Sequence, residues 1–388
     1  MTRFTKTTTT LAALLATTTI AHAGGVERQG QSPAILFQDG SYVEFGFTYV
    51  DPEITGVQQE TIATLGSSAG SESRDIAPAY SYSSFAYRQD VTDALSFAVM
   101  YDQPIGADVN YTPNSGPGYA YGTGRGSQAE INSNALTLAA RYEFSENFSV
   151  YGGLRAVSAE GSVALFDGSA GAGGRYLMNA ESDYELGYML GAAYERPDIA
   201  LRVALTYYSA TDHTFSGTEG TSAGGVGPTT FETTIPQQLL LEAQTGVAEG
   251  TLVFGSVRWV DWTEFNITPP LYTGSISSGN SLVSYDNDVF TYTLGGARVL
   301  NDTWTVLGSI THETSNGGFS GNLGPTDGRT SLGLGARYTI GDTTITGGIN
   351  YTFIGDAITE SPVTPGTTFA NFDDNHAVGF GLRVGYTF

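Results

Sequence analysis

The residues best able to do chemistry are few and widely spaced in this sequence. It has no cysteine and four histidines, of which His213, His312 and His376 lie beyond the first segment of the chain. None of these three stands at a spacing that metal ligands use, and neither an H-E-x-x-H sequence nor a serine in a strand-to-helix elbow is present. We therefore predict no enzyme activity, no cofactor and no metal site, and expect His213 and His312 near the extracellular interface.

Charged side chains recur at alternate positions within apolar stretches. Arg155, Arg202 and Arg337 are the clearest examples, and each stands between neighbours that favour an apolar surface. Two interpretations remain open. The charges form pairs that fill and brace a polar interior, or these arginines act in gating and hold a ligand carboxylate through charge-assisted hydrogen bonds.

Large apolar side chains also occur where we expect long loops. Exposed apolar patches usually mark a contact or ligand surface, so these residues are candidates for a groove that captures a hydrophobic ligand. A loop that packs on itself as a lid is an equally good explanation. The candidates are Ile105, Val109, Tyr111, Leu165, Phe166, Tyr176, Leu177 and Met178.

The elements that carry these residues read as strands. In the last segment, alternate residues from Val378 to Phe388 are apolar, while Arg383 and several glycines fill the other face. A pleated strand sends alternate side chains to opposite faces, and this pattern suits a wall with hydrocarbon outside and a polar interior. Windows of this kind predict fourteen strands that begin near residues 41, 79, 94, 131, 148, 183, 200, 237, 251, 287, 303, 330, 343 and 376.

Connections between these windows alternate between short and long. Bacterial membrane barrels have even strand numbers, short periplasmic turns and longer extracellular loops. The sequence therefore predicts an all-β, 14-stranded antiparallel transmembrane β-barrel over residues 41–388. Its 51 Gly, 23 Tyr and 20 Phe suit such a barrel, and 39 acidic against 16 basic residues make nucleic acid a poor partner.

The N-terminal segment predicts export. Arg3 and Lys6 precede a short apolar run and then the cleavage pattern Ala21-His22-Ala23, which is typical of a signal peptide over residues 1–23. Residues 24–40 then remain as a short N-terminal plug, in which Ile35, Leu36 and Phe37 are candidates for closing the pore. We expect an integral protein of the bacterial outer membrane.

Several segments resemble the FadL/TodX family of outer-membrane transporters for hydrophobic compounds. The similar stretches include residues 183–217, Ile235 to Gln244 followed by Gly255 to Phe265 with Trp259 and Trp262, residues 85–111 and residues 325–338. The resemblance implies a fourteen-stranded barrel that takes up long-chain fatty acids or other hydrophobic molecules through a loop groove, a luminal site and a lateral opening.

One departure from that family concerns the plug. The family carries an N-terminal hatch with an Asn-Pro-Ala motif, whereas here the segment is short and its nearest match is Ser32-Pro33-Ala34. Pro104 with Gly106 either breaks the third strand and opens the wall or only marks where a loop begins.

These observations predict passive transport of hydrophobic molecules such as fatty acids or aromatic hydrocarbons by a monomer. A general porin, a structural or adhesive barrel and an outer-membrane lipid hydrolase are the alternatives. The acidic loops suggest a further hypothesis, in which divalent cations bridge the protein to lipopolysaccharide in the outer-membrane lipid.

Overall fold

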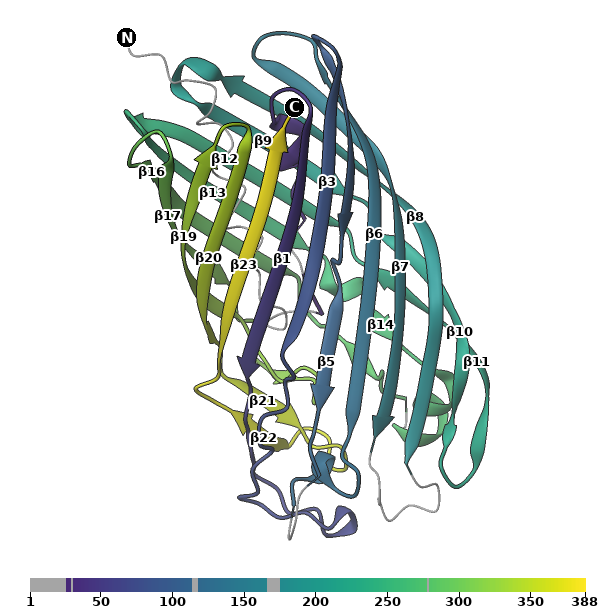
Figure 1. Cartoon of the computed structure of the whole chain (residues 1–388). Helices are drawn as coiled ribbons and strands as arrows, with labels where there is room; N and C mark the ends of the chain where they lie inside the picture. Colours follow the sequence, from purple (N-terminus) through teal and green to yellow (C-terminus); the bar gives the residue numbers. More distant parts are fainter. Residues whose placement is uncertain (1–25, 29–30, 114–117, 166–174, 278) are drawn as a thin grey trace.

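The computed structural model describes residues 26–28, 31–113, 118–165, 175–277 and 279–388 of the chain. These residues form one large antiparallel sheet that closes into a tilted barrel (Figure 1). Its strands are β1 (Tyr42–Glu53), β3 (Tyr80–Thr92), β4 (Leu95–Asp102), β5 (Gly106–Asn110), β6 (Gln128–Glu143), β7 (Phe148–Leu165), β8 (Tyr176–Arg196), β9 (Leu201–Tyr208), β10 (Thr211–Thr221), β11 (Gly225–Ile235), β12 (Gln238–Ala248), β13 (Thr251–Val260), β16 (Val289–Val299), β17 (Trp304–Glu313), β19 (Arg329–Ile340), β20 (Thr343–Ile354) and β23 (His376–Thr387).

Three of the barrel positions are strands with a break. The first consists of β4 and β5, which both pair with β6. The second consists of β9 and β10, which both pair with β8. The third consists of β11, which pairs with β10, and β12, which pairs with β9. Counting each broken strand once gives fourteen, and β1 pairs with β23 along twelve residue pairs to close the ring. The predicted fourteen-stranded antiparallel barrel is confirmed.

Alternation along the strands sorts side chains between the two faces of the wall. In β1, Phe45, Phe47 and Tyr49 are exposed on the outside, whereas Thr48 and Val50 are buried inside. Exposed apolar residues of this kind cover the outer wall, where hydrocarbon is their natural solvent. The inward faces carry buried arginines, so that charged side chains occupy part of the barrel interior.

The two ends of the barrel differ. Short turns join β3 to β4, β6 to β7, β12 to β13, β16 to β17 and β19 to β20 at the end where the chain finishes, at the top of Figure 1. Long loops gather at the other end and hold small strands. These are β2 (Val57–Gln58), β14 (Asn266–Ile267), β15 (Val283–Ser284), β18 (Phe319–Ser320), β21 (Ala357–Glu360) and β22 (Thr368–Phe372).

The helical elements are single turns, and no helix among the described residues is long and apolar enough to cross a membrane. One of them, η3 (Ala34–Phe37), precedes the first barrel strand. The others are η4 (Ala63–Leu65), η5 (Ala120–Gly122), η6 (Pro197–Ile199), η7 (Trp262–Glu264) and η8 (Tyr272–Ile276).

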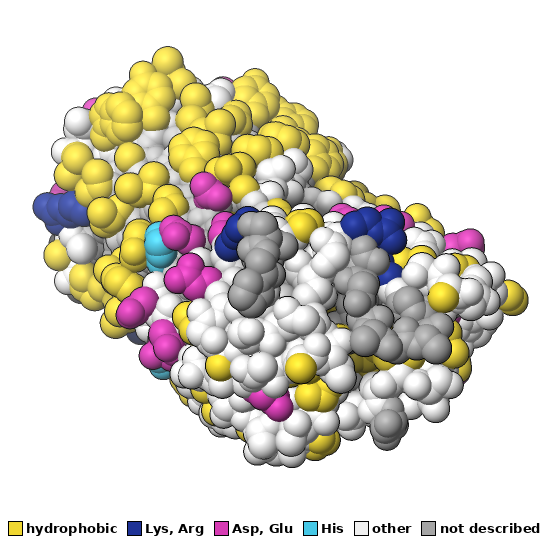
Figure 2. All heavy atoms as spheres, turned by 90° about the horizontal axis from the view of Figure 1, so that it is seen from below, with side chains coloured by type: hydrophobic (Ala, Val, Ile, Leu, Met, Phe, Trp, Pro, Cys, Tyr) yellow, Lys and Arg dark blue, Asp and Glu magenta, His cyan; other side chains and the backbone are white. Residues whose placement is uncertain are grey.

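The long loops pack on one another to form an aromatic cap. Its centre consists of five buried rings, Tyr111, Tyr119, Tyr121, Phe369 and Phe372, with Tyr111 and Tyr119 stacked at 5.5 Å between centroids. Burial raises the pKa of Tyr119 well above its ordinary value, so its hydroxyl stays neutral at any physiological pH. Seen from this end, the loops present a largely uncharged polar surface, with acidic and histidine side chains at the border of the apolar wall (Figure 2).

Candidate functional site

The N-terminal segment enters the barrel and lies against its inner wall. Helix η3 places Ile35, Leu36 and Phe37 in a buried cluster with inward residues of several strands. The Phe37 ring meets the Tyr151 ring edge-on at 5.5 Å. We name residues Ala34–Phe37 the plug turn.

Arginines from the wall hold the plug turn in place. The guanidinium groups of Arg141 and Arg202 lie over the Phe37 ring at 4.6 and 4.5 Å from its centroid. Arg141 also donates to the carbonyl oxygen of Leu36 and pairs with Glu195. Cations over an aromatic face are attracted by its quadrupole, so the same charges that brace the wall also fix the plug turn.

A second level of contacts lies just before the plug turn. Gln31 donates to Asp102 at 2.9 Å and accepts from Gln238, which bridges β4 to β12 across the lumen. Ser32 donates to Glu242 at 2.9 Å. The strand partners Asp102, Gln238 and Glu242 are inward polar side chains. They give the buried polar groups of this segment the hydrogen bonds that such groups normally have.

The first described residues complete the wall itself. Val26, Glu27 and Arg28, which we name the N-terminal strap, run antiparallel to the break between β4 and β5, with Glu27 opposite Ile105. Arg28 N donates to Pro104 O at 2.9 Å and Gly106 N donates to Val26 O at 3.0 Å. The strap is thus a one-bridge strand added to an open sheet edge.

That edge is open because the third strand is broken. The β3–β4 ladder ends at the pair Phe85 and Tyr101, and β5 forms its ladder with β6 on its other side. On the β3 side, Asn110 N of β5 donates to Ile76 O at 2.8 Å. Pro104 has no N–H to give to a ladder, and the side-chain oxygen of Gln103 accepts from Ser83 N instead. The wall is therefore interrupted between β3 and β5, and the strand does not simply end at Pro104.

Arg28 lies in this interruption. Its guanidinium carbon sits 4.4 Å from the centroid of the Tyr80 ring on β3. A Cβ on Gly106 of β5 would come within 2.4 Å of Arg28 Nε, so glycine is required there for the side chain to fit. Arg28 consequently contacts both strands that fail to pair with each other.

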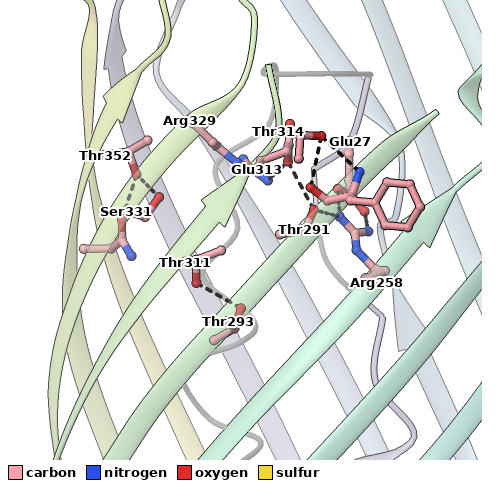
Figure 3. A network of polar contacts seen from close by, with 12 residues as sticks. Glu27, Arg258, Thr291, Thr293, Thr311, Glu313, Thr314, Arg329, Ser331 and Thr352 are labelled. Atoms are coloured by element: carbon pink, nitrogen blue, oxygen red, sulfur yellow. Dashed lines mark hydrogen bonds and ion pairs between the residues drawn. The ribbon is translucent and has the colours of Figure 1, made fainter. Parts of the chain in front are cut away.

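On the opposite wall the strap meets a row of polar side chains. Both carboxylate oxygens of Glu27 accept from Arg258 on β13, and Arg258 also donates to Thr291 on β16 at 3.3 Å (Figure 3). Thr291 donates to Glu313 at 3.4 Å, and Arg329 pairs with Glu313 at 2.8 Å. The row links four strands to the strap.

An apolar cluster lies next to this row, on the side of the long loops, and we name it the loop-side cluster. On β13, the inward residue Val260 follows Arg258 by two positions, and on β16, Val289 precedes Thr291 by two positions. Both valines therefore lie next to the polar row on the same face. The buried members are Val26, Ile105, Ala107, Ala159, Val163, Leu165, Tyr176, Met178, Ala180, Phe215, Phe231, Val260, Trp262, Phe265, Ile267 and Val289.

The structure places most of the predicted groove residues inside apolar clusters. Ile105, Leu165, Tyr176 and Met178 belong to the loop-side cluster, and Val109 and Tyr111 belong to the aromatic cap. Leu177 is partly exposed and lines, with Val109 and Met178, a hollow of about 390 Å³ beside β5 to β8. Phe166 lies outside the described residues.

The prediction that these residues stand in loops is wrong for five of them. Val109 belongs to β5, and pairing between β7 and β8 continues as far as Leu165 opposite Tyr176, with Leu177 and Met178 within the ladder. The strands extend beyond the region of alternating apolar residues, because pairing needs only backbone hydrogen bonds and not a hydrocarbon-facing surface.

The three predicted luminal arginines are all buried and inward, but in different surroundings. Arg202 contacts Phe37 and donates to Gln244 at 3.3 Å. Arg155 lies over the Tyr208 ring at 5.0 Å. Nε and Nη1 of Arg337 have no hydrogen-bond partner among the described residues.

Sequence reasoning missed the strap and its partner Arg258. Glu27 and Arg28 lie within the predicted plug of residues 24–40, but nothing in their local pattern indicates a strand. Arg258 stands in a stretch where the alternation of apolar and polar residues falters. A charged residue between Val257 and Trp259 was the feature of the sequence that could have indicated an inward arginine. Among the described residues, no group of three or more acidic or histidine side chains is arranged to hold a metal ion.

Comparisons with known proteins agree with this architecture. A crystal structure of a Pseudomonas aeruginosa FadL homologue superposes with a TM-score of 0.74 at 16% identity, over 92% of each chain. The Pseudomonas putida toluene transporter TodX gives 0.63 at 12% identity over 95% of this chain and 96% of that one. The Ralstonia pickettii toluene transporter TbuX gives 0.63 at 15% identity over 96% and 97%.

These structural likenesses establish the fold, and no curated protein sequence matches the chain significantly. The family is established separately, by a family model that matches residues 5–388, which is nearly the whole sequence. The chain is therefore an integral outer-membrane barrel protein, and it belongs to the family of outer membrane transport proteins described as OMPP1/FadL/TodX.

Proposed function

We propose that this protein lets hydrophobic molecules such as fatty acids or aromatic hydrocarbons cross the outer membrane passively, through the interrupted wall beside β5. The single observation that carries the proposal is the position of the N-terminal strap. It bonds to the third strand just beyond the point where the β3–β4 ladder ends, next to a large apolar cluster.

The route follows from the chemistry of each part. A hydrophobic molecule leaves water among the apolar side chains of the loop-side cluster, where its transfer is favourable in proportion to its buried area. Further travel through the lumen would take it past buried arginines and carboxylates, which is costly. Movement of the strap opens a shorter path, between β3 and β5, to the hydrocarbon outside the wall.

No bond is made or broken in this scheme, and the scheme includes no catalytic residue and no cofactor. Transport is downhill and depends on the strap exchanging between a bound and a released state. The monomer supplies every part of the route. A second proposal is that divalent cations bridge the acidic loops to lipopolysaccharide. It is supported by the carboxylates around Asp373, whose pKa is raised by partial burial and then by the nearby charges of Asp356 and Asp374.

A reversible cross-link tests the gate. Glu27 and Ile105 form a pair flanked by the two strap hydrogen bonds, a geometry in which Cβ atoms lie close enough for a disulfide. The chain has no cysteine of its own. In the double variant Glu27→Cys and Ile105→Cys, we expect the oxidised protein to block uptake of a fluorescent fatty acid into proteoliposomes and reduction to restore it.

A matched control exists in the loops. Val57 and Glu72 form an isolated antiparallel bridge flanked by the same two kinds of hydrogen bond. Cysteines at these two positions should cross-link equally well and leave uptake independent of reduction. Equal uptake by the oxidised and reduced strap variant would show that the strap does not gate the route.

A further inference from the structure

Three neighbouring strands are much longer than a membrane crossing needs. β6, β7 and β8 have 16, 18 and 21 residues, whereas β1 and β23 have 12 each. A strand that crosses the hydrocarbon needs about 9 to 11 residues. The extra residues lie at the end of the long loops, where Figure 1 shows these strands continuing past the end of β1. The wall therefore stands above the membrane on this side of the barrel.

The outer face of this extension carries polar side chains at one level, which we name the outer row. Its members are Asp108 of β5, Glu130 of β6, Ser162 of β7, Asn179 of β8 and Thr218 of β10, each directly opposite the next. Directly opposite residues share a face of a sheet. That face is the outer one, because Glu130 lies an even number of positions from the exposed Leu136 and Leu138 on β6. With strands about 4.8 Å apart, the row is about 19 Å long.

Two tyrosines show how far the outer row lies above the hydrocarbon, since aromatic girdles mark the membrane interface of a barrel. The outward Tyr101 donates to Asn134 of β6 at 2.6 Å, and Tyr184 of β8 is exposed. Glu130 is four residues nearer the loops than Asn134, and Asn179 is five residues nearer than Tyr184. Four residues of a tilted strand rise about 10 Å. The outer row is therefore at the height of the lipid head groups.

A hollow of about 390 Å³ opens along the outer row. Ligand pockets usually measure about 300 to 1,000 Å³. Besides the outer row, the outward residues that line it are Asn110, Gln128, Ala164, Leu177 and Val226. Among the described residues, no basic side chain lines the hollow. Two carboxylates without a basic neighbour in the lining repel phosphate and carboxylate groups, so the hollow does not favour an anion.

The donors and acceptors of the outer row match the hydroxyl groups of a neutral sugar. Its carboxylates only accept hydrogen bonds, whereas the amide of Asn179 and the hydroxyls of Ser162 and Thr218 both donate and accept. Asn132 donates to Glu130 at 2.6 Å, which helps to fix the position of one acceptor. The apolar part of the lining suits the C–H faces of sugar rings. A short neutral oligosaccharide therefore fits this face better than an alkyl chain does.

We propose that the outer row and its hollow bind the neutral sugars of one lipopolysaccharide molecule in the outer leaflet, with no cation between them. The sugars of this lipid surround an outer-membrane barrel at the height of the outer row. The proposal does not depend on transport. It also differs from cation bridging at the acidic loops, because no group of three acidic or histidine side chains among the described residues is arranged to hold a metal ion.

Binding of two forms of lipopolysaccharide to the full chain tests the proposal. One form carries its complete core of sugars, and the other is truncated to the sugars next to the lipid. By native mass spectrometry in detergent micelles with EDTA, we expect the wild-type protein to bind the complete form about tenfold more tightly, the scale of two hydrogen bonds. Ser162→Trp, which fills the hollow, should abolish this preference. The double variant Glu130→Ala and Asn179→Ala, which removes a carboxylate and an amide, should abolish it too.

Ser81→Trp is the matched control. Ser81 is an exposed serine that faces outward on β3 beside Tyr49, three strand positions from Ser162, so this change should keep the preference. The substituted residues of the outer row are exposed, and heat-modifiable migration on gels confirms that each variant is a folded barrel. Equal binding of the two forms by the wild type, or a preference that survives in both variants, would overturn the sugar site. Binding that EDTA abolishes would also overturn it and assign the contact to bridging cations.

Discussion

Phe37 is the side chain through which the plug turn contacts the guanidinium groups and an aromatic ring of the wall. It is buried among wall residues, and it receives two guanidinium groups and the edge of one tyrosine. Each cation over a ring contributes about 0.5 to 2 kcal/mol, depending on how far the pair is desolvated. Phe37 is the one aromatic residue of the plug turn, so its removal takes away the cation–ring contacts of both Arg141 and Arg202 with this segment.

Phe37→Ala should therefore release the plug turn without unfolding the barrel. We expect higher conductance in planar bilayers and greater sensitivity of cells to bulky antibiotics, because the loss of about 2 kcal/mol or more is concentrated in a short segment. The control is Phe45→Ala, which removes the same ring from the lipid-facing side of β1. An unchanged conductance in Phe37→Ala would assign closure to the loops and the luminal charges.

At the scale of elements, a second irregularity lies between β8 and β10. The ladder between β8 and β10 stops at Ala180 opposite Gly217. The ladder between β8 and β9, the other half of the same broken strand, begins at Met189 opposite Tyr208 in the same register. Side chains bridge the interval. Ser209 Oγ accepts from Tyr188 N at 2.9 Å, and the buried His213 ring lies 3.1 Å from Asp183.

His213→Ala should loosen this seam, because Asp183 then loses its partner across the interval. We expect faster amide exchange in residues 209–216, with a local loss of about 1 to 3 kcal/mol, the usual cost of a buried polar group left unpaired. Hydrogen exchange followed by mass spectrometry measures it. His312→Ala is the control, since His312 is exposed and its ring hydrogen-bonds to Thr330 on the neighbouring strand. Equal protection in the two variants would show that backbone pairing holds the seam.

For the whole molecule, closure depends on the first and last strands. β1 and β23 pair along their full length, and the terminal Phe388 stacks on Tyr87 and Tyr386 at 6.1 and 6.0 Å. The Phe388 N–H also donates to Ser41 O at 3.0 Å. Phe388 thus contacts β3 and β23 and bonds to the residue just before β1, so it lies across the β1–β23 seam.

Deletion of Phe388 should lower the yield of membrane-inserted, heat-modifiable barrel several-fold, because an unclosed edge cannot remain in hydrocarbon. Thr387→Ala, which leaves the aromatic contacts in place, should assemble normally. Quantitative blotting of outer-membrane fractions compares the two. Similar yields from both variants would mean that the closing pair forms without this ring.

The sequence was sufficient for the features that depend on local alternation. Lipid-facing residues such as Phe45 and inward charges such as Arg155 lie on opposite faces because side chains in a strand alternate. This pattern holds in most of the fourteen predicted strands and falters around Arg258. Arg298, which interrupts the outward pattern, lies near the end of β16 and donates to Glu249 O in the adjacent β12–β13 turn, where it can avoid the hydrocarbon.

Features that depend on distant pairing were not predictable in this way. Glu27 of the strap pairs with Ile105, which lies 78 positions later at the break between β4 and β5. The charge of Glu27 is matched by Arg258, which is still more distant in the sequence. Three residues cannot show an alternating pattern. The burial of Tyr111 and Tyr176 likewise depends on which loops and strands meet, and their apolar character alone fits a groove or a packed lid equally well.

The strap belongs to the same chain as the barrel, and this has a kinetic consequence for the proposed gate. A seal on a short tether experiences an effective concentration in the range of about millimolar, whatever the amount of protein in the membrane. After each opening it therefore returns before any free peptide could replace it, and even a weak seal stays shut most of the time. For the proposed gate, we therefore expect openings to be brief.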